Sequence, residues 1–91
     1  MKFEWDAAKS KANKEKHGID FETAKDLWID EHRIEIDAPH PVEKRSIIIA
    51  ELRGKLWTAV YTMRSDAIRI ISVRRSRRKE TELYGKEEEI G

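Results

Sequence analysis

The N-terminal residues carry two successive patterns of polar and apolar side chains. Residues 2–5 read Lys-Phe-Glu-Trp, and this alternation predicts a short, half-buried strand. Asp6 is a favourable N-cap and Gly18 is a favourable residue after a helix C-terminus, so we expect a helix from about Ala7 to His17. Its apolar residues are alanines alone, which predicts a helix on the surface.

A second helix is predicted immediately afterwards, and it has a well-defined apolar face. Asp20 is again a favourable N-cap. Phe21, Ala24, Leu27 and Trp28 then recur at the spacing of one helix face. This helix is the best candidate in the sequence for packing against a sheet.

The centre of the chain is rich in strand patterns. Alternation over Arg33–Asp37 predicts one strand, and the two prolines in Ala38–Pro41 predict a loop after it. Three more strands are expected, with the turn sequences Arg53-Gly54 and Ser65-Asp66 between them: Ser46–Leu52, Leu56–Met63 and Ala67–Arg74. Ile47-Ile48-Ile49 does not alternate, so that strand should be interior and covered on both faces.

The chain is expected to end in a helix from about Arg77 to Glu89, with Ser76 as its N-cap. The element order is then β-α-α-β-β-β-β-α, which predicts an α+β fold: an antiparallel β-sheet with two N-terminal helices and one C-terminal helix. A chain of 91 residues has room for one hydrophobic core, so we expect a single domain over residues 1–91.

Charge is unevenly distributed, although the formal net charge is only +1. Residues 1–45 carry 9 Lys/Arg and 11 Asp/Glu, a net charge of −2, whereas residues 46–91 carry 10 and 7, a net charge of +3. Within residues 64–79, seven bases accompany a single acid, Asp66: Arg64, Arg69, Arg74, Arg75, Arg77, Arg78 and Lys79. This local excess of +6 predicts a binding surface for a polyanion.

The period of a strand divides these cations between two faces of a sheet. Regular alternation over residues 67–75 puts Arg74 on the same face as Ile70, and it puts Arg69 and Arg75 together on the opposite face. Arg74 and Arg75 therefore cannot both point into one cleft unless the strand bends there. The sequence alone does not choose between them.

Composition also limits the compartment. The absence of cysteine removes disulfides and thiolate zinc sites, and it agrees with the reducing cytoplasm. No apolar run approaches the roughly 20 residues of a membrane-spanning helix, and the N-terminus has no apolar signal region. We expect a cytoplasmic protein without a membrane partner.

Several catalytic chemistries have no support in the sequence. His17, His32 and His40 are scattered and do not have the spacing of metal ligands, so no metal site is expected. There is no Gly-x-Ser-x-Gly motif and no glycine-rich phosphate loop. With 4 glycines in the chain, we expect no nucleotide cofactor either.

Metal-free cleavage of RNA needs only the groups that remain. The 2′-hydroxyl attacks its own phosphate, and a protein supplies proton carriers together with cations for the charge that develops on phosphate. Arginine suits the cationic task because its planar fork matches phosphate oxygens, and DNA is excluded because it lacks the 2′-hydroxyl. From residues alone, however, RNA binding is better supported than catalysis, and Tyr61 and His17 have ordinary structural interpretations as well.

The sequence resembles the BrnT-type toxins of bacterial toxin–antitoxin pairs over nearly its whole length. The similarity rests on a series of short motifs in order: Phe3-Glu4-Trp5-Asp6, Lys9, Asn13, Lys16-His17-Gly18, Phe21, Asp30, Arg45, Val60-Tyr61-Thr62, Arg64, Arg69 to Arg75, Glu80 and Tyr84. Each motif is weak alone, but the order and spacing are specific. The resemblance implies a RelE-like fold and a ribonuclease that halts translation.

The same resemblance implies partners and site residues. It implies a cognate antitoxin with a ribbon-helix-helix DNA-binding part, so that operator DNA is bound only through the antitoxin. The residues carried over as catalytic are Arg64, Arg74, His17 and Tyr61, with Arg75 as the alternative to Arg74. The residues expected to bind the RNA substrate are Lys16, Arg45, Arg69 and Arg75 from the resemblance, together with Arg77 and Arg78 from the basic segment.

Three positions depart from the family pattern. Ala50 stands where glycine is frequent, Met63 where an acid is common, and Ser76 where alanine is usual. If an acid at position 63 helps proton transfer, its loss predicts a weaker nuclease. Two further hypotheses therefore stay open: a non-catalytic nucleic-acid-binding module and a module that binds only the antitoxin, both using the same basic surface.

Overall fold

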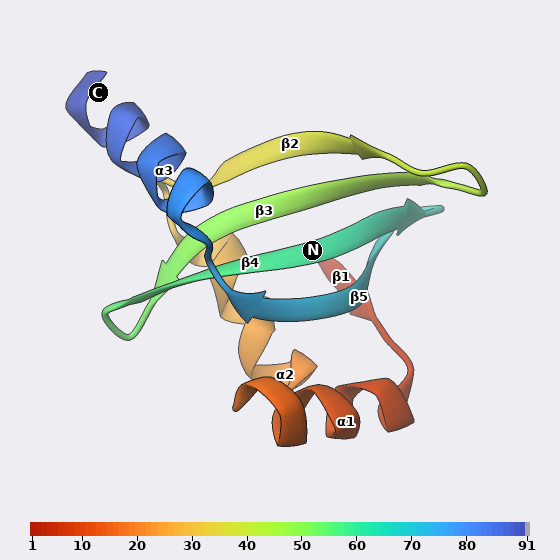
Figure 1. The fold of residues 1–91 in the computed structure, drawn as a ribbon. Helices are drawn as coiled ribbons and strands as arrows, with labels where there is room; N and C mark the ends of the chain where they lie inside the picture. Colours follow the sequence, from red (N-terminus) through yellow and green to blue (C-terminus); the bar gives the residue numbers. More distant parts are fainter. Residues whose placement is uncertain (91) are drawn as a thin grey trace.

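Five strands and three α-helices make up the described chain (Figure 1). The computed structural model describes the backbone of residues 1–90 and the side chains of residues 1–85. The elements are β1 (Lys2–Glu4), α1 (Ala7–His17), α2 (Phe21–Ala24), the 3-10 helix η1 (Lys25–Ile29), β2 (Ile34–Pro39), β3 (Lys44–Leu52), β4 (Lys55–Arg64), β5 (Ala67–Arg75) and α3 (Arg78–Ile90). The predicted α+β class and the predicted element order are confirmed.

The strands form one sheet in the order β1-β5-β4-β3-β2. The pairs from β2 to β5 are antiparallel, as the predicted fold class requires, and the turn sequences had indicated this for β3–β4 and β4–β5. β1 pairs with β5 in parallel, so the expectation of a wholly antiparallel sheet was wrong at this edge. No short turn joins these two strands, because the rest of the sheet and two helices lie between them in the sequence, and tertiary packing alone sets their direction.

The N-terminal helices cover one face of the sheet, here called the helix-covered face (Figure 1). α1 ends as predicted at Gly18, whose φ is +81° and whose N–H donates to the Lys14 carbonyl. It is mostly exposed and buries polar residues, Ser10 and Asn13. The Asn13 amide donates to the Ile19 and Val73 carbonyls (2.8 and 2.9 Å) and accepts from the Val73 N–H (3.1 Å), which ties α1 to β5.

The predicted second helix has the expected apolar face but not the expected regular geometry. Its first four residues form α2, and the rest tightens into the 3-10 helix η1. Phe21, Ala24, Leu27 and Trp28 are all buried, and they face the core side chains of β3, β4 and β5. Trp28 meets the ring of Tyr61 edge-on, with 5.2 Å between centroids.

Among the described residues, only α3 covers the opposite face of the sheet, and it does so at one end; this face is here called the open face (Figure 1). Tyr84 of α3 is buried, and its hydroxyl donates to the Asp30 carboxylate at 2.7 Å. Ile48 faces the helix-covered side and Ile49 the open side, and both are fully buried, so the prediction of an interior strand covered on both faces holds for these two residues.

The predicted end of β2, start of β3 and cap of α3 were wrong. β2 continues through Pro39 and β3 begins at Lys44, because Pro39 lies on an edge strand where its missing N–H costs no hydrogen bond. Ser76 does not cap α3: its hydroxyl lies 2.8 Å from that of Thr58. The first helical bond runs from the Thr81 N–H to the Arg77 carbonyl, which makes Arg77 the capping residue.

A bulge in β5 changes the predicted distribution of side chains. Val60 of β4 pairs with Ser72, but the next residue, Tyr61, pairs with Ile70, so Ile71 is an extra residue on β5. Alternation is therefore interrupted at Ile71. The prediction of regular alternation was wrong. Residues before and after the bulge that would lie on opposite faces in a regular strand, such as Arg69 and Arg74, lie on the same face.

Candidate nucleic-acid interface

Three arginines form a row along the open face. Arg69 pairs with Thr62 and Arg74 pairs with Thr58, and Arg64 follows on the same strand as both threonines. Because alternate residues of a strand share a face, all five side chains point to the open face. At about 3.3 Å per residue, the row from Arg74 to Arg64 is about 20 Å long, which is enough for several phosphates of an RNA strand.

Arg45 adds a fourth cation to the open face from β3. It pairs with Ala38 and precedes Ser46, which lies opposite Tyr61 on the helix-covered face. The Arg45 Nε–H donates to the Glu43 carboxylate at 2.8 Å. This hydrogen bond, with the charge of Arg45, holds the pKa of Glu43 below its ordinary value.

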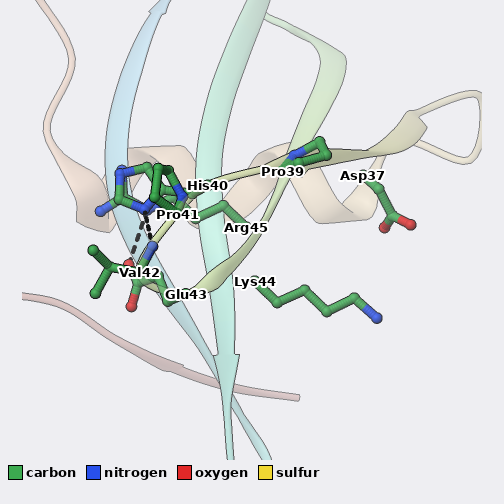
Figure 2. Close-up of a pocket in the computed structure, with 8 residues that line it drawn as sticks. All are labelled: Asp37, Pro39, His40, Pro41, Val42, Glu43, Lys44 and Arg45. Carbon is green, nitrogen blue, oxygen red and sulfur yellow. Dashed lines mark hydrogen bonds and ion pairs between the residues drawn. The ribbon is translucent and has the colours of Figure 1, made fainter.

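A shallow pocket lies beside Arg45, where β2 and β3 are connected (Figure 2). Its lining residues are Asp37, Pro39, His40, Pro41, Val42, Glu43, Lys44 and Arg45. The His40 Nδ1 accepts a hydrogen bond from the Val42 N–H at 3.2 Å. Figure 2 shows Arg45 and Lys44 extending in opposite directions, so the connection carries cations on two sides.

The arginines of the row differ in how they are paired. Arg69 forms an ion pair of 3.5 Å with Glu4 of the neighbouring strand β1. Arg64 is exposed, and within the described part of the chain no carboxylate lies within 4.0 Å of it. Arg64 is thus the cation of the row that is most available to an incoming anion.

Arg74 is held by Glu80 of α3 through two parallel hydrogen bonds. The Arg74 Nη1 lies 2.8 Å from Oε1 of Glu80, and Nη2 lies 2.7 Å from Oε2. Glu80 also accepts from the Arg77 N–H (2.7 Å) and the Thr58 hydroxyl (3.1 Å). The bonds from Arg74, aided by those from Arg77 and Thr58, lower the pKa of Glu80 to about 2, and the same pair raises the pKa of Arg74.

Arg75 lies on the helix-covered face, opposite Trp57 in β4. Its guanidinium carbon is 5.5 Å from the centroid of the Trp57 ring, and its Nε–H donates to the Leu56 carbonyl at 3.3 Å. The bulge at Ile71 therefore settles the choice that the sequence left open. Of the two consecutive arginines, Arg74 shares a face with Arg64 and Arg69, and Arg75 does not.

Tyr61 also lies on the helix-covered face, away from the row of arginines. Its hydroxyl donates to the Glu35 carboxylate at 2.5 Å. Burial raises the pKa of the Tyr61 hydroxyl well above its ordinary value, and the bond to Glu35 raises it further. A buried tyrosine whose hydroxyl has a hydrogen-bond partner is what the structural interpretation of Tyr61 expected.

Lys16 and His17 end α1 on the helix-covered side. His17 is half-buried one turn after Asn13, which is bonded to Val73 of β5, and Lys16 is exposed beside it. The structure thus brings these two residues to the face of Arg75, and it does not bring them to Arg64 and Arg74.

Arg77 and Arg78 stand at the start of α3 and are both exposed. Arg78 pairs with Glu82 one turn later at 3.4 Å, although its side chain is 93% exposed. Because surface pairs of this kind are worth less than about 1 kcal/mol, this guanidinium is available to an anion. Both residues extend the cationic region beyond the end of β5.

The three departures from the family pattern lie in different surroundings. Ala50 is fully buried on the helix-covered face. Met63 alternates with Thr62 and Arg64, so it points away from the open face, and its side chain is 58% exposed. Met63 is therefore not directed at the arginines of the row.

The role of Glu80 is the feature that sequence reasoning missed. The sequence predicts Ser76 as the helix cap, and a capping partner three residues later is then Lys79. With Arg77 as the cap, the third helical residue is Glu80, and its bond to the Arg77 N–H is the reciprocal half of a capping box. The helix start is the signal that could have identified this glutamate.

The described part of the chain has neither a metal-binding cluster nor a membrane-spanning helix. No three His, Cys, Asp or Glu side chains come together there as a metal site. No helix among the described residues has the length and apolarity needed to cross a bilayer.

The fold and the arginine row define a class of protein: a small α+β protein with guanidinium groups presented on an open sheet face, a chemistry suited to phosphates. The chain belongs to the BrnT family, because the family model for the ribonuclease toxin, BrnT, of type II toxin–antitoxin systems matches residues 5–80. No curated protein matches the chain significantly. The resemblance seen in the sequence is confirmed, and with it a ribonuclease toxin that pairs with an antitoxin.

Proposed function

We propose that this protein is a cytoplasmic, metal-independent endoribonuclease, a single domain over residues 1–91, that cuts RNA and thereby stops translation and growth. The observation that supports this most directly is the alignment of Arg64, Arg69 and Arg74 on one open sheet face. RNA lies along this row with its phosphates against the guanidinium groups. Arg45, Arg77 and Arg78 contact the flanking phosphates.

The reaction is an internal transfer at phosphorus. The 2′-oxygen of one nucleotide bonds to the adjacent phosphorus as the bond to the 5′-oxygen breaks, which leaves a 2′,3′-cyclic phosphate and a 5′-hydroxyl. The 2′-hydroxyl gives its proton to water, and the leaving 5′-oxygen takes a proton from water. Arg74 and Arg64 stabilise the negative charge on the phosphate oxygens in the transition state.

The proposed site differs from the sequence-based one in its proton carriers. His17, Lys16 and Tyr61 lie on the other side of the sheet, and the carboxylates beside the row, Glu4 and Glu80, are paired with arginines. The protein therefore contributes by binding and orienting the RNA and by stabilising the charge on the phosphate in the transition state. Arg75 is likewise left out of the catalytic set.

The partner is an antitoxin that neutralises the nuclease. We propose that it carries a ribbon-helix-helix DNA-binding part and that the complex reaches operator DNA through that part alone. The toxin's own cations are then occupied by RNA or by the antitoxin. A complex in which the toxin contacts the operator directly would contradict this assignment.

Cleavage of RNA in EDTA tests the proposal. Wild-type protein, Arg64→Ala and Arg74→Ala are incubated with total RNA and with an oligonucleotide carrying a 2′-deoxy group at the mapped cut. The expected result is cleavage by wild type, much slower but measurable cleavage by the two arginine variants, cyclic phosphate ends, and no cut at the 2′-deoxy position. Folded wild-type protein that binds RNA without cutting it would leave the non-catalytic binding module as the function.

A further inference from the structure

Glu80 occupies one side of the Arg74 guanidinium and leaves another side free. Nη1 and Nη2 each give one hydrogen to the Glu80 carboxylate, and Nη1 gives its second hydrogen to the Arg75 carbonyl at 3.3 Å. Among the described residues, the Nε–H and the second Nη2 hydrogen have no acceptor. These two hydrogens lie on the same edge of the planar group, so a complete two-pronged donor remains for a phosphate.

Glu80 is itself held firmly. Its side chain is only 14% exposed, and besides Arg74 it accepts from the Arg77 N–H and from the Thr58 hydroxyl. Thr58 is 1% exposed and lies directly opposite Arg74 on β4. The carboxylate is thus fixed to the start of α3 and to the sheet at once, which fixes the plane of the guanidinium as well.

We propose that Glu80 is a positioning residue for cleavage, which orients Arg74 so that its Nε and Nη2 hydrogens face the scissile phosphate. This inference rests on the proposed function. Without Glu80, Arg74 keeps its charge but rotates freely about its long side chain. Loss of orientation affects the transition state more than the binding of the substrate, so it lowers kcat more than it changes KM.

A double-mutant cycle separates positioning from a purely structural role. Cleavage of a mapped RNA oligonucleotide is measured for wild type, Glu80→Gln, Arg74→Ala and the double variant, well below their unfolding temperatures. Glutamine retains one oxygen for the Arg77 N–H and so preserves the helix cap. Glu22→Gln is the matched control, because it breaks an ion pair between Glu22 of α2 and Lys25 of η1, on the helix-covered side of the sheet.

Glu80→Gln is expected to lower kcat by roughly 10- to 100-fold with KM changed by less than about threefold. In the Arg74→Ala background the same substitution should have no further effect, because Glu80 acts through Arg74. Glu22→Gln should cut like wild type. A loss on Glu80→Gln that is equally large with and without Arg74 would overturn the inference.

A binding measurement tests the orientation even if the protein does not cut. The Arg74 Nε–H resonance is followed by NMR while a DNA oligonucleotide, which cannot be cleaved by this route, is titrated in. Wild type should give one sharp resonance that shifts on binding, and Glu80→Gln a broadened one that does not shift. This outcome without any RNA cleavage would end the proposed nuclease function but leave Glu80 as the residue that orients Arg74 toward a bound phosphate. The same shift in both proteins would end the inference.

Discussion

At the scale of single residues, buried polar side chains define this fold as much as apolar ones. Asn13 is 8% exposed and has three hydrogen bonds, all to backbone groups of Ile19 and Val73. A buried amide with its bonds satisfied fits only one docking position, because any shift leaves donors and acceptors without partners. Asn13 therefore fixes α1 against β5 one residue before Arg74.

Removal of the Asn13 amide should be costly. Asn13→Ala leaves the Val73 N–H and two carbonyls without partners in a buried position, so we expect the free energy of unfolding to fall by about 2–3 kcal/mol. Urea unfolding followed by circular dichroism measures this. Lys11→Ala, an exposed position on the same helix, is the control, and a loss no larger than that of the control would contradict the prediction.

The Arg74–Glu80 pair predicts an acid-dependent loss of stability. The pKa of Glu80 is lowered to about 2 in the folded protein, below its ordinary value of 4.5. A depressed folded pKa means that the stabilisation is complete above pH 4.5 and is lost as the pH falls from there towards 2. We expect a loss on the order of 2 kcal/mol across this window from this residue.

Comparison with Glu80→Gln isolates that contribution. Other carboxylates titrate in the same range, and Asp30 is one of them: burial opposes its ionisation, but bonds from Glu51, Tyr84 and His32 outweigh burial and lower its pKa. The prediction therefore concerns the difference between the two proteins. The stability gap between wild type and Glu80→Gln should narrow from pH 5 to pH 2, and a constant gap would rule it out.

At the scale of elements, α3 is attached to the rest of the protein by hydrogen bonds from two of its residues, Glu80 and Tyr84. Glu80 binds Thr58 and Arg74 at the start of the helix, and Tyr84 binds Asp30 one turn later. Among the described side chains of α3, Tyr84 alone is buried and Leu83 is 43% exposed, so these bonds carry much of the attachment of this part of the helix. The stability of α3 is expected to be lower than that of the sheet.

Tyr84→Phe should loosen α3 without unfolding the sheet. It removes a 2.7 Å hydrogen bond to the charged Asp30, and bonds of this kind contribute about 1.5–3 kcal/mol. We expect amide exchange in residues 78–85 to accelerate by about tenfold or more, since about 1.4 kcal/mol is a tenfold change. The amides of β4 should change much less, and equal acceleration in both elements would show that α3 and the sheet open together.

At the scale of the whole molecule, the sheet separates two groups of cations. Arg64, Arg69 and Arg74 lie on the open face, whereas Arg75 and α1 lie on the other side. A net charge of +1 gives no sign of this arrangement. Binding of a polyanion depends on the local field, so the open face can attract RNA although the protein is nearly neutral.

Matched substitutions on one strand test this separation. Arg69→Gln and Arg75→Gln remove the same charge six residues apart, on opposite faces. Arg69→Gln should weaken RNA binding and reduce the slope of log affinity against log salt by about 0.7, the value for one phosphate contact on a single strand. Arg75→Gln should leave the slope unchanged, and equal effects of the two would contradict the assignment of the open face.

The sequence was sufficient for what depends on local preference. Caps at Asp6 and Asp20, a left-handed Gly18 and the periodicity of the apolar residues predicted the helices, the strands and the α+β class. These features depend on interactions within a few residues, which are visible in the sequence. The family, confirmed over residues 5–80, was likewise evident from the order of short motifs.

Only the tertiary structure decided which side chains meet. One extra residue, Ile71, shifts the period of β5, so that Arg69 and Arg74 share a face and Arg75 leaves it. The parallel pairing of β1 with β5 and the bond between Arg74 and Glu80 also depend on how separate elements pack together. Because side chains alternate between the two faces of a sheet, one inserted residue moves all the following side chains to the other face. The position of such a bulge follows from packing between distant strands rather than from local preference.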